Sequence, residues 1–321
     1  MKTVLEDSKA VQSKDAKEVA ILLCTMNGRD FLAEQLGSIA AQTHSRWKLW
    51  VSDDGSTDDS QNVVRGFSRQ WGENKVALVA GPSKGFATNF LSLACRPEIA
   101  ADYYAFADQD DVWEVDRLSR ALAWLETISP ETPALYCGRT LLIAEDGAKI
   151  GISPLYAKTP SFANALVECL AGGNTMVFNN AARKLLQVAG SGIKVVSHDW
   201  WLYLLVSACD GTIFYDTDPT VRYRQHGGNM ISSKTGLKAR LAQSWEVFQG
   251  GFRERTATNV LALGTVQSLF SQRSTEIFQR FAAARQRSIL LRCLGILRSG
   301  VYRQTVTGNV GLMLACLLGK I

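Results

Sequence analysis

The sequence predicts an α/β fold in which a mostly parallel sheet is flanked by helices. Short, wholly apolar runs of strand length alternate with segments whose apolar residues recur at helical spacing. Polar and acidic residues gather directly after these runs, where the carboxyl ends of parallel strands bind ligands. The 321-residue chain is 46% hydrophobic and 20% charged, which is enough apolar material for a core and argues against disorder.

Strands and helices alternate through the first 130 residues. The expected strands are Val19–Thr25, Trp47–Val51, Lys75–Val79 and Asp102–Ala107. Helices are expected at Asp30–Ala41 and Val115–Thr127. Two more are expected in between, one with its N-cap and first-turn acids at Ser56–Asp59 and one opened by Lys84–Asn89. Crossovers of this kind are right-handed and make the strands parallel.

The middle of the chain mixes strands with irregular segments. A strand is expected at Ala134–Ile143, and a glycine bend from Ala171 enters another strand ending at Phe178. The paired glycines in that bend mark either a bulge or a place where a ligand lies close to the backbone. A capped helix is expected from Ser197, and a strand from Val221 ends in a polar glycine loop.

From Ser232 the sequence favours helices with scattered arginines. Residues 284–321 mix apolar and basic side chains, and the longest uncharged run, Val310–Leu318, is too short to span a bilayer. This segment is an amphipathic region drawn to anionic lipid, a layer packed on the main domain, or a dimer face. We therefore divide the chain into a leader at 1–18, a main domain at 19–231 and a helical region at 232–321.

Composition excludes several classes of protein. The net charge of +5 is mild, and the chain contains no arginine-rich helix, so a nucleic-acid partner is not expected. Seven scattered cysteines, odd in number and never spaced as Cys-x-x-Cys, argue for a reducing compartment and against a disulfide frame or zinc site. The polar leader lacks the apolar core of a signal peptide.

Three carboxylates cluster directly after the fourth expected strand, at Asp108, Asp110 and Asp111. If the chain stays extended there, Asp108 and Asp110 lie on the same side. Carboxylates beside an open face suit a hard divalent cation that also takes ligands from a diphosphate. The alternative is a solvated acidic turn.

Other polar residues follow the strands in the same way, and together they favour a nucleotide pocket. These residues are Thr25, Asn27, Asp53, Asp54, Gly85, Asn89 and Asp108. No Gly-x-Gly-x-x-Gly or P-loop motif is present. Taken alone, Asp199 is an acid in a helix first turn and His226 a structural or solvated histidine.

Motifs in a fixed order carry a resemblance to a known family. They are Thr25-Met26-Asn27-Gly28, Ser52-Asp53-Asp54-Gly55-Ser56-Thr57-Asp58 and Asp108-Gln109-Asp110-Asp111-Val112-Trp113. This order resembles the family 2 inverting glycosyltransferases. Two later motifs, His198-Asp199-Trp200-Trp201 and Tyr223-Arg224-Gln225-His226-Gly227-Gly228-Asn229, are similar to those of bacterial rhamnosyltransferases. The resemblance covers residues 19–229.

The resemblance implies a GT-A fold and a nucleotide-sugar donor, dTDP-L-rhamnose. It also implies a hydroxyl acceptor on a lipid-linked or cell-surface glycan, as in O-antigen, capsule or exopolysaccharide assembly. The expected location is the cytoplasm, at the inner face of a bacterial membrane. A UDP-sugar donor with another hexose or N-acetylhexosamine is the alternative within the family.

The resemblance also assigns roles to individual residues. Asp54 would hold the base, in a pocket lined by Thr25 and Asn27, and Gly85 and Asn89 would contact the donor. Asp110 would bind Mg²⁺ or Mn²⁺, with Asp108 near the ribose or the metal and His226 completing the metal or diphosphate site. Asp199 would be the catalytic base, although many members have Glu-Asp where this chain has His198-Asp199. Gly172, Gly173, Asn174 and Trp200 are assigned to the sugar and acceptor pocket.

The chemistry fits these residues. A divalent cation would neutralise charge on the nucleoside diphosphate leaving group, and Asp199 would deprotonate the acceptor hydroxyl. A sugar nucleotidyltransferase would need a lysine- and glycine-rich phosphate loop, but Thr25–Asp30 offers only Arg29. An alternative of another class is a non-catalytic scaffold docked to a membrane through residues 284–321.

Overall fold

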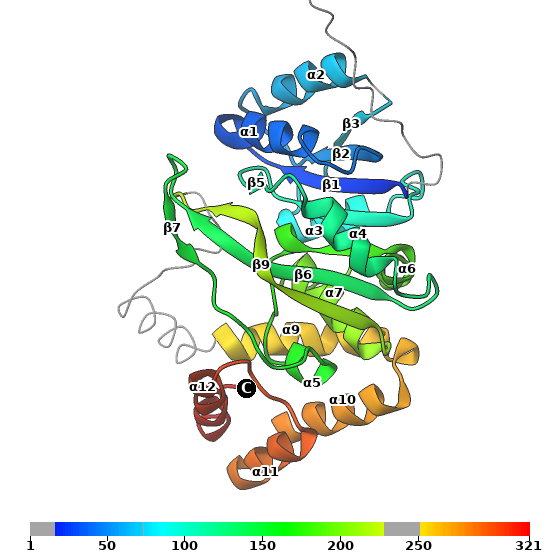
Figure 1. Cartoon of the computed structure of the whole chain (residues 1–321). Coiled ribbons are helices and arrows are strands. Elements are labelled where there is room, and N and C mark those ends of the chain that lie inside the picture. Colours follow the sequence, from blue (N-terminus) through cyan, green and yellow to red (C-terminus); the bar gives the residue numbers. More distant parts are fainter. Residues whose placement is uncertain (1–16, 73, 228–250) are drawn as a thin grey trace, which may run out of the picture.

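The computed structural model describes residues 17–72, 74–227 and 251–321 (Figure 1). The expected leader therefore lies almost wholly outside the described residues, and so does the expected boundary at 231–232. Within them, the predicted α/β architecture is confirmed: a mixed sheet has helices on both faces, and further helices follow it.

The first half of the sheet is parallel. Its strands are β1 (Val19–Thr25), β2 (Trp47–Asp53), β3 (Val76–Ala80) and β4 (Tyr103–Ala107). They lie in the order β3-β2-β1-β4, which places the earliest strand in the middle. The predicted bounds of β1 match those observed, and β2 runs two residues further than expected, so that Asp53 is its last residue.

The second half of the sheet is mixed. The order continues from β4 through β8, β6 and β9 to β5, with β7 pairing to β6. These strands are β5 (Val112–Trp113), β6 (Ala134–Ile143), β7 (Lys149–Ile152), β8 (Val177–Asn179) and β9 (Thr212–Arg224). The pair β6–β9 is parallel, whereas β8 is antiparallel to both β4 and β6.

β1 explains why the strands of the first half are apolar throughout. Ile21 and Leu23 belong to one buried cluster together with residues of helices α1 (Arg29–Ala40), α2 (Ser60–Trp71) and α4 (Arg117–Leu125). Leu22 and Cys24 belong to another cluster, formed with helices on the opposite face. Since successive side chains of a strand point to opposite faces, a strand covered on both sides has no polar position.

The second face is covered by helices that include α3 (Phe86–Cys95), α6 (Asn180–Ala189) and α7 (His198–Ala208). Every residue of α7 is buried, because α3, α5 (Phe162–Ala165), α6 and the strands β6 and β9 surround it. The predicted start of this helix at Ser197 is confirmed, but the predicted cap is not formed by its side chain. Ser197 occupies the N-cap position, but its side chain makes no capping hydrogen bond.

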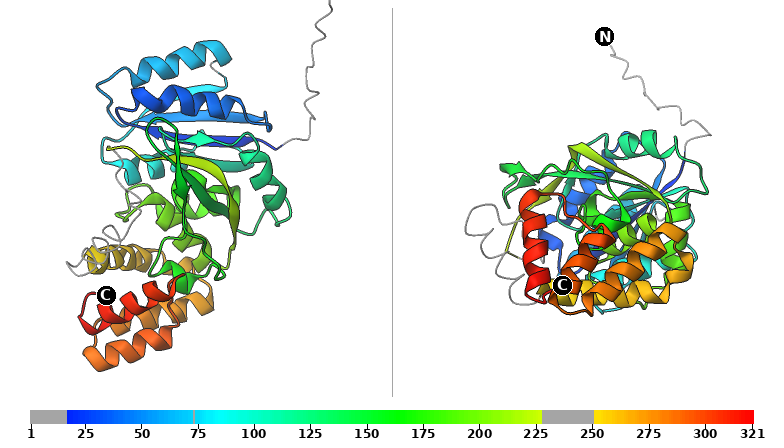
Figure 2. Two further views of the ribbon diagram at one scale, coloured as in Figure 1. Left: turned by 60° about the vertical axis from the view of Figure 1, so that its left-hand side comes forward. Right: turned by 90° about the horizontal axis from the view of Figure 1, so that it is seen from below.

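The C-terminal helices extend the same core. They are α9 (Gly251–Thr265), α10 (Gln272–Arg285), α11 (Ile289–Ser299) and α12 (Val306–Leu317). Phe278, Phe281 and Leu312 belong to the buried cluster that contains Leu22, so these helices pack as a layer on the main domain. α10, α11 and α12 form the end of the molecule farthest from α2 (Figures 1 and 2). No helix in the described ranges is long and apolar enough to cross a membrane.

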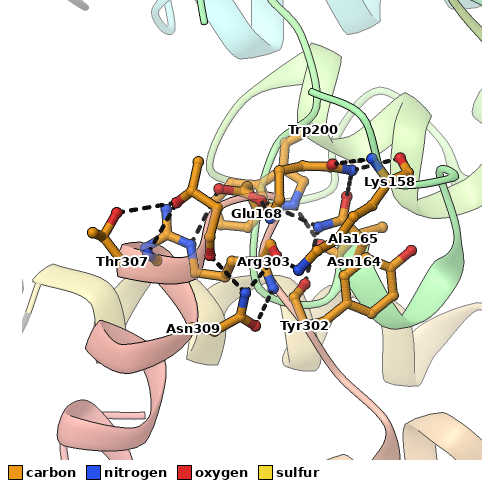
Figure 3. A network of polar contacts seen from close by, with 12 residues as sticks. Lys158, Asn164, Ala165, Glu168, Trp200, Tyr302, Arg303, Thr307 and Asn309 are labelled. Atoms are coloured by element: carbon orange, nitrogen blue, oxygen red, sulfur yellow. Dashed lines mark hydrogen bonds and ion pairs between the residues drawn. The ribbon is translucent and has the colours of Figure 1, made fainter. Parts of the chain in front are cut away.

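A buried polar network joins α5 to the loop between α11 and α12 (Figure 3). The Glu168 carboxylate accepts hydrogen bonds from the Gln304 backbone N–H at 2.6 Å and from Arg303 Nε at 3.2 Å. Asn164 Nδ2 donates to the Tyr302 carbonyl at 2.9 Å. The attachment of the C-terminal helices is therefore polar as well as apolar.

Candidate active site

The loops that follow β1 and β2 are locked together by the residues that the motifs single out. The Thr25 carbonyl accepts from the Asp54 N–H at 2.9 Å. Asn27 adopts the left-handed conformation, with φ of 51°, and its Oδ1 accepts from the Thr57 N–H at 2.8 Å. The Asn27 N–H donates to Ser56 Oγ. In this structure Asn27 organises the edge of the expected nucleotide pocket through its own backbone and side chain.

Gln109 ties the acidic cluster to the first loop, a role that the motifs alone do not reveal. Its Oε1 accepts from Thr25 Oγ1 at 2.7 Å and from the Met26 N–H at 2.8 Å. A Cβ at Gly28 would overlap this amide, which explains why a glycine stands there. The loops after β1 and β4 are therefore held side by side.

Asp53 and Asp54 are both buried, but their partners differ. Asp54 accepts from the backbone N–H groups of Ser83, at 2.7 Å, and Gly85, at 3.2 Å, so both of its oxygens hold the turn after β3. Asp53 Oδ1 accepts from the N–H groups of its own turn. Asp53 Oδ2 is buried and has no hydrogen-bond partner among the described residues. A ligand N–H would satisfy it.

Asn89, expected to contact the donor, is buried against β2. Its Oδ1 accepts from Ser52 Oγ at 2.5 Å and its Nδ2 donates to the Ser52 carbonyl. Both polar groups of this side chain therefore bind protein. Gly85 lies at the start of α3 with φ of 86°, a conformation that favours glycine.

The acidic cluster does not continue β4. The backbone bends at Gln109 and Asp110, so the extended chain that would align Asp108 with Asp110 is not formed. Burial raises the pKa of Asp108 well above its ordinary value, and the charges of Asp111, Asp110 and Asp199 raise it further. Asp108 therefore lies close enough to interact with each of the other three carboxylates, although Asp199 comes from a distant part of the sequence.

Asp111 faces the interior of the protein. Asn174 Nδ2 donates to its Oδ2 at 2.5 Å, and the Arg224 N–H donates to its Oδ1. Burial, together with the charge of Asp110, raises the pKa of Asp111 to about 8. Asn174, assigned to the sugar pocket, is therefore engaged in holding this carboxylate.

Asp110 meets His226 across the site. Asp110 Oδ2 lies 2.7 Å from His226 Nε2, and the His226 ring packs against Phe31 at a centroid distance of 4.9 Å. The Asp110 carbonyl accepts from Arg224 Nε at 3.0 Å. The described residues contain no group of three or more His, Cys, Asp or Glu side chains that could hold a metal ion. The pair nevertheless fits a divalent cation whose remaining ligands are diphosphate oxygens, as the donor set of carboxylate and imidazole allows.

Arg117 brings a second buried positive charge to the site besides Arg224, and the motifs do not point to it. Its Nη2 donates to the Asn174 carbonyl at 2.6 Å, and its guanidinium lies 3.7 Å from the centroid of the Trp113 ring. Burial lowers its pKa to about 9, while the charges of Tyr136, Asp111 and Asp108 oppose this. It offsets part of the repulsion among the carboxylates.

Asp199 stands at the start of α7 and is held by the glycine bend. Its Oδ2 accepts from the Gly173 N–H at 3.1 Å and its Oδ1 from the Trp200 N–H at 2.6 Å. A Cβ at Gly173 would overlap His198 Nε2 and come within 3.3 Å of the Asp199 Cβ. The glycine pair is expected to mark either a bulge or a place where a ligand lies close to the backbone. At Gly173 the group that lies close to the backbone is the start of α7. Trp200 is buried, and its indole N–H donates to the Ala165 carbonyl at 2.6 Å.

The neighbouring His198 is buried among aromatic rings. It stacks on Phe90 at a centroid distance of 3.8 Å and meets Phe106 edge-on. Neither ring nitrogen has a hydrogen-bond partner among the described residues. Burial lowers its pKa to about 4, although the charge of Asp199 opposes this. His198 is therefore neutral at physiological pH.

Comparison with solved structures defines the fold. Over 94% of this chain and 90% of that one, the fold matches TarS 1–349 of S. aureus, whose structure contains UDP-GlcNAc, with a TM-score of 0.53 and 13% identity. GalNAc-T7, solved with UDP, GalNAc and Mn²⁺, matches with a TM-score of 0.55 and 10% identity over 90% of this chain and 56% of that one. These likenesses establish a GT-A fold.

Sequence comparisons find similar proteins over part of the chain. Residues 20–149 match the model described as Glycosyl transferase family 2. The chain is 24% identical to the dTDP-rhamnosyl transferase RfbG of Shigella flexneri over 226 residues, which are 68% of this chain and 76% of that protein. Residues 20–149, which contain the motifs at the ends of β1, β2 and β4, are therefore similar to family 2 glycosyltransferases.

Proposed function

We propose that the donor is dTDP-L-rhamnose and that the acceptor is a hydroxyl of a lipid-linked or cell-surface glycan, at the inner face of a bacterial membrane. The likeness to the Shigella dTDP-rhamnosyl transferase, which spans two thirds of the chain, supports the sugar. The observation that carries the reaction is that neighbouring residues of one bend, Gly173 and Asn174, bond Asp199 and the acidic cluster, which brings Asp108 within range of the charges of Asp110 and Asp199.

Asp199 is the catalytic base in this proposal. The N–H groups of Gly173 and Trp200 hold its carboxylate in place, and each oxygen keeps a further lone pair for an incoming hydroxyl. The carboxylate takes the hydroxyl proton as the acceptor oxygen bonds to the anomeric carbon. The bond from that carbon to the diphosphate oxygen breaks, and its electron pair leaves with the nucleoside diphosphate. One in-line displacement inverts the anomeric centre without a covalent nucleophile.

Asp110 and His226 would hold Mg²⁺ or Mn²⁺. The bound ion would neutralise charge on the leaving diphosphate. The chain's own contribution is to fix this pair: Arg224 Nε holds the Asp110 carbonyl, and Phe31 packs against the His226 ring. For the nucleoside base, Asp53 offers its unpartnered oxygen beside Asp54, whose oxygens hold the turn after β3.

Two substitutions test the reaction. We expect Asp199→Asn and Asp110→Ala each to lower donor turnover by about 10²–10⁴-fold, because each removes a group that acts on the transition state. Turnover is measured as nucleotide release with acceptor glycan and Mn²⁺, and circular dichroism checks folding. The control is Asp146→Asn, an exposed carboxylate in the β6–β7 turn, which should leave turnover unchanged.

A panel of donors tests the sugar separately. The wild-type protein should turn over dTDP-L-rhamnose faster than UDP-glucose, UDP-galactose or UDP-N-acetylglucosamine. Faster turnover of a UDP-sugar would overturn the rhamnose assignment and leave the transferase intact. Near-normal turnover by folded Asp199→Asn would overturn the mechanism itself.

A further inference from the structure

The exposed apolar side chains of this protein are concentrated at one end. Of the eighteen large apolar residues that are exposed in the described ranges, ten lie between residues 289 and 318. On α11, Leu290, Leu294 and Leu297 follow one another at helical spacing, and Leu290 is 82% exposed. On α12 the stripe contains Val306, Val310, Leu314, Leu317 and Leu318. Such a concentration marks an interaction surface.

The same end is strongly basic. Residues 272–321 include eight Lys and Arg residues and one acid, Glu276, which pairs with Arg280, whereas the whole chain has 35 basic and 30 acidic residues. Arg287 and Arg298 are exposed and form no salt bridge within the described part of the chain. An apolar face among uncompensated cations is complementary to an anionic, partly apolar surface.

A groove between α10 and α11 combines both properties. Its volume is about 480 Å³, and it is lined by Arg280, Arg287 and Arg298 together with Leu291 and Leu294. Three guanidinium groups around an apolar floor suit a phosphate group that is attached to hydrocarbon. Seen from that end, α10, α11 and α12 lie in front of the rest of the molecule (Figure 2).

We propose that α10, α11 and α12 dock on an anionic phospholipid membrane, with a lipid phosphate in the α10–α11 groove and the leucine stripes in the headgroup–acyl boundary. A second copy of the chain fits less well, because a symmetric dimer would bring the same unpaired arginines together. The helices lie on the membrane, since none of those described is long and apolar enough to cross it. The polar network at Glu168 attaches this surface firmly to the catalytic domain.

Vesicle flotation without any donor tests this docking independently of the transferase reaction. The wild-type chain should bind vesicles of phosphatidylcholine with phosphatidylglycerol at least tenfold more than vesicles of phosphatidylcholine alone. Arg287→Gln with Arg298→Gln should lower binding about tenfold or more, because each basic side chain near the surface contributes about 1 kcal/mol. Leu290→Gln with Leu294→Gln and Leu297→Gln should lower it at least as much.

Matched controls lie elsewhere on the molecule. Leu261→Gln on α9 removes an apolar side chain that is 74% exposed, and Arg65→Gln with Arg69→Gln on α2 makes the same charge change at the opposite end. Both should bind vesicles as the wild type does. Circular dichroism and nucleotide release should be normal in every variant.

Three results would overturn the proposal. They are equal binding to neutral and anionic vesicles, retention of binding by both surface variants, and a concentration-dependent dimer that the leucine variant abolishes while vesicles fail to bind. Displacement of the protein from vesicles by inorganic phosphate would show that the groove takes a free anion, and would also count against docking.

Discussion

The candidate active site and the C-terminal helices differ from ordinary protein in opposite ways: the site buries charged side chains, and the helices expose apolar ones. At the site, burial raises the pKa of Asp108, and the charges of Asp111, Asp110 and Asp199 raise it further. At α11 and α12, leucines remain in water among cations. Each arrangement is unfavourable in the isolated chain, and a ligand can offset each one, a cation in the first case and an anionic lipid surface in the second. The candidate functional regions are therefore the two places where the fold leaves an unfavourable charge or an exposed apolar surface without a partner.

The largest effect in this comparison is expected at Gly173, on the acidic side. Gly173→Ala places a methyl group against His198 Nε2 and within 3.3 Å of the Asp199 Cβ, so the start of α7 must shift. Displacement of the base should lower nucleotide release up to about a hundredfold. Vesicle binding should not change, because the C-terminal surface is untouched.

Gly192→Ala is the matched control, since no heavy atom lies within 4 Å of the added Cβ. It should be as active as the wild-type protein. If Gly173→Ala retained full turnover, the glycine bend would not position the base, and Asp199 would have to be held by other contacts.

Glu168 tests the joint between the two regions. It is buried, and Glu168→Gln removes the charge that accepts from Arg303 Nε and the Gln304 N–H. Loss of this pairing should lower the free energy of unfolding by about 2 kcal/mol. Limited trypsin digestion should then cut first at arginines between residues 285 and 303.

The control for the joint is Glu98→Gln, which removes a carboxylate from an exposed pair with Arg96. Its denaturation midpoint and cleavage pattern should match those of the wild type. Uniform cleavage of Glu168→Gln along the whole chain would mean that the two regions unfold together and that Glu168 is no separate joint.

The sequence predicts the parallel half of the fold well, because its signals are local. A strand covered on both faces must be apolar throughout, and Val19–Thr25 is recognisable for that reason. The antiparallel pairing of β8 is harder to predict. This strand has only three residues, too few to show a periodic pattern, and its partner strands lie far away in sequence. Which side of α11 stays exposed is equally invisible, because a helical stripe shows that a face exists and not what covers it.

The candidate site follows the same division. Motifs at strand ends single out Asp54 and Asp110, since parallel strands end at one edge. Asp199, at the start of α7, is singled out by the family resemblance instead. The partners that hold the site are missed. Gln109 lies inside a motif without a predicted role, and Arg117 looks like an ordinary helical arginine, although it is fully buried beneath the carboxylates. Their importance depends on contacts across the sheet.

The smallest effect is expected at His198, which should make the free energy of unfolding depend on pH. Burial lowers the pKa of this histidine to about 4, so the unfolded chain, with an ordinary pKa near 6.5, binds its proton first as pH falls. The folded protein therefore loses stability from about pH 6.5 down to about pH 4, by about 1 kcal/mol at about pH 5.5. His198→Leu lacks this loss, and its unfolding free energy, measured in urea, should depend less on pH across that range.

His44→Gln, which changes a histidine outside the site, should keep the wild-type slope. If the curves of His198→Leu and the wild type ran parallel, His198 would accept its proton equally in both states, and the apolar surroundings of α7 would not control its charge.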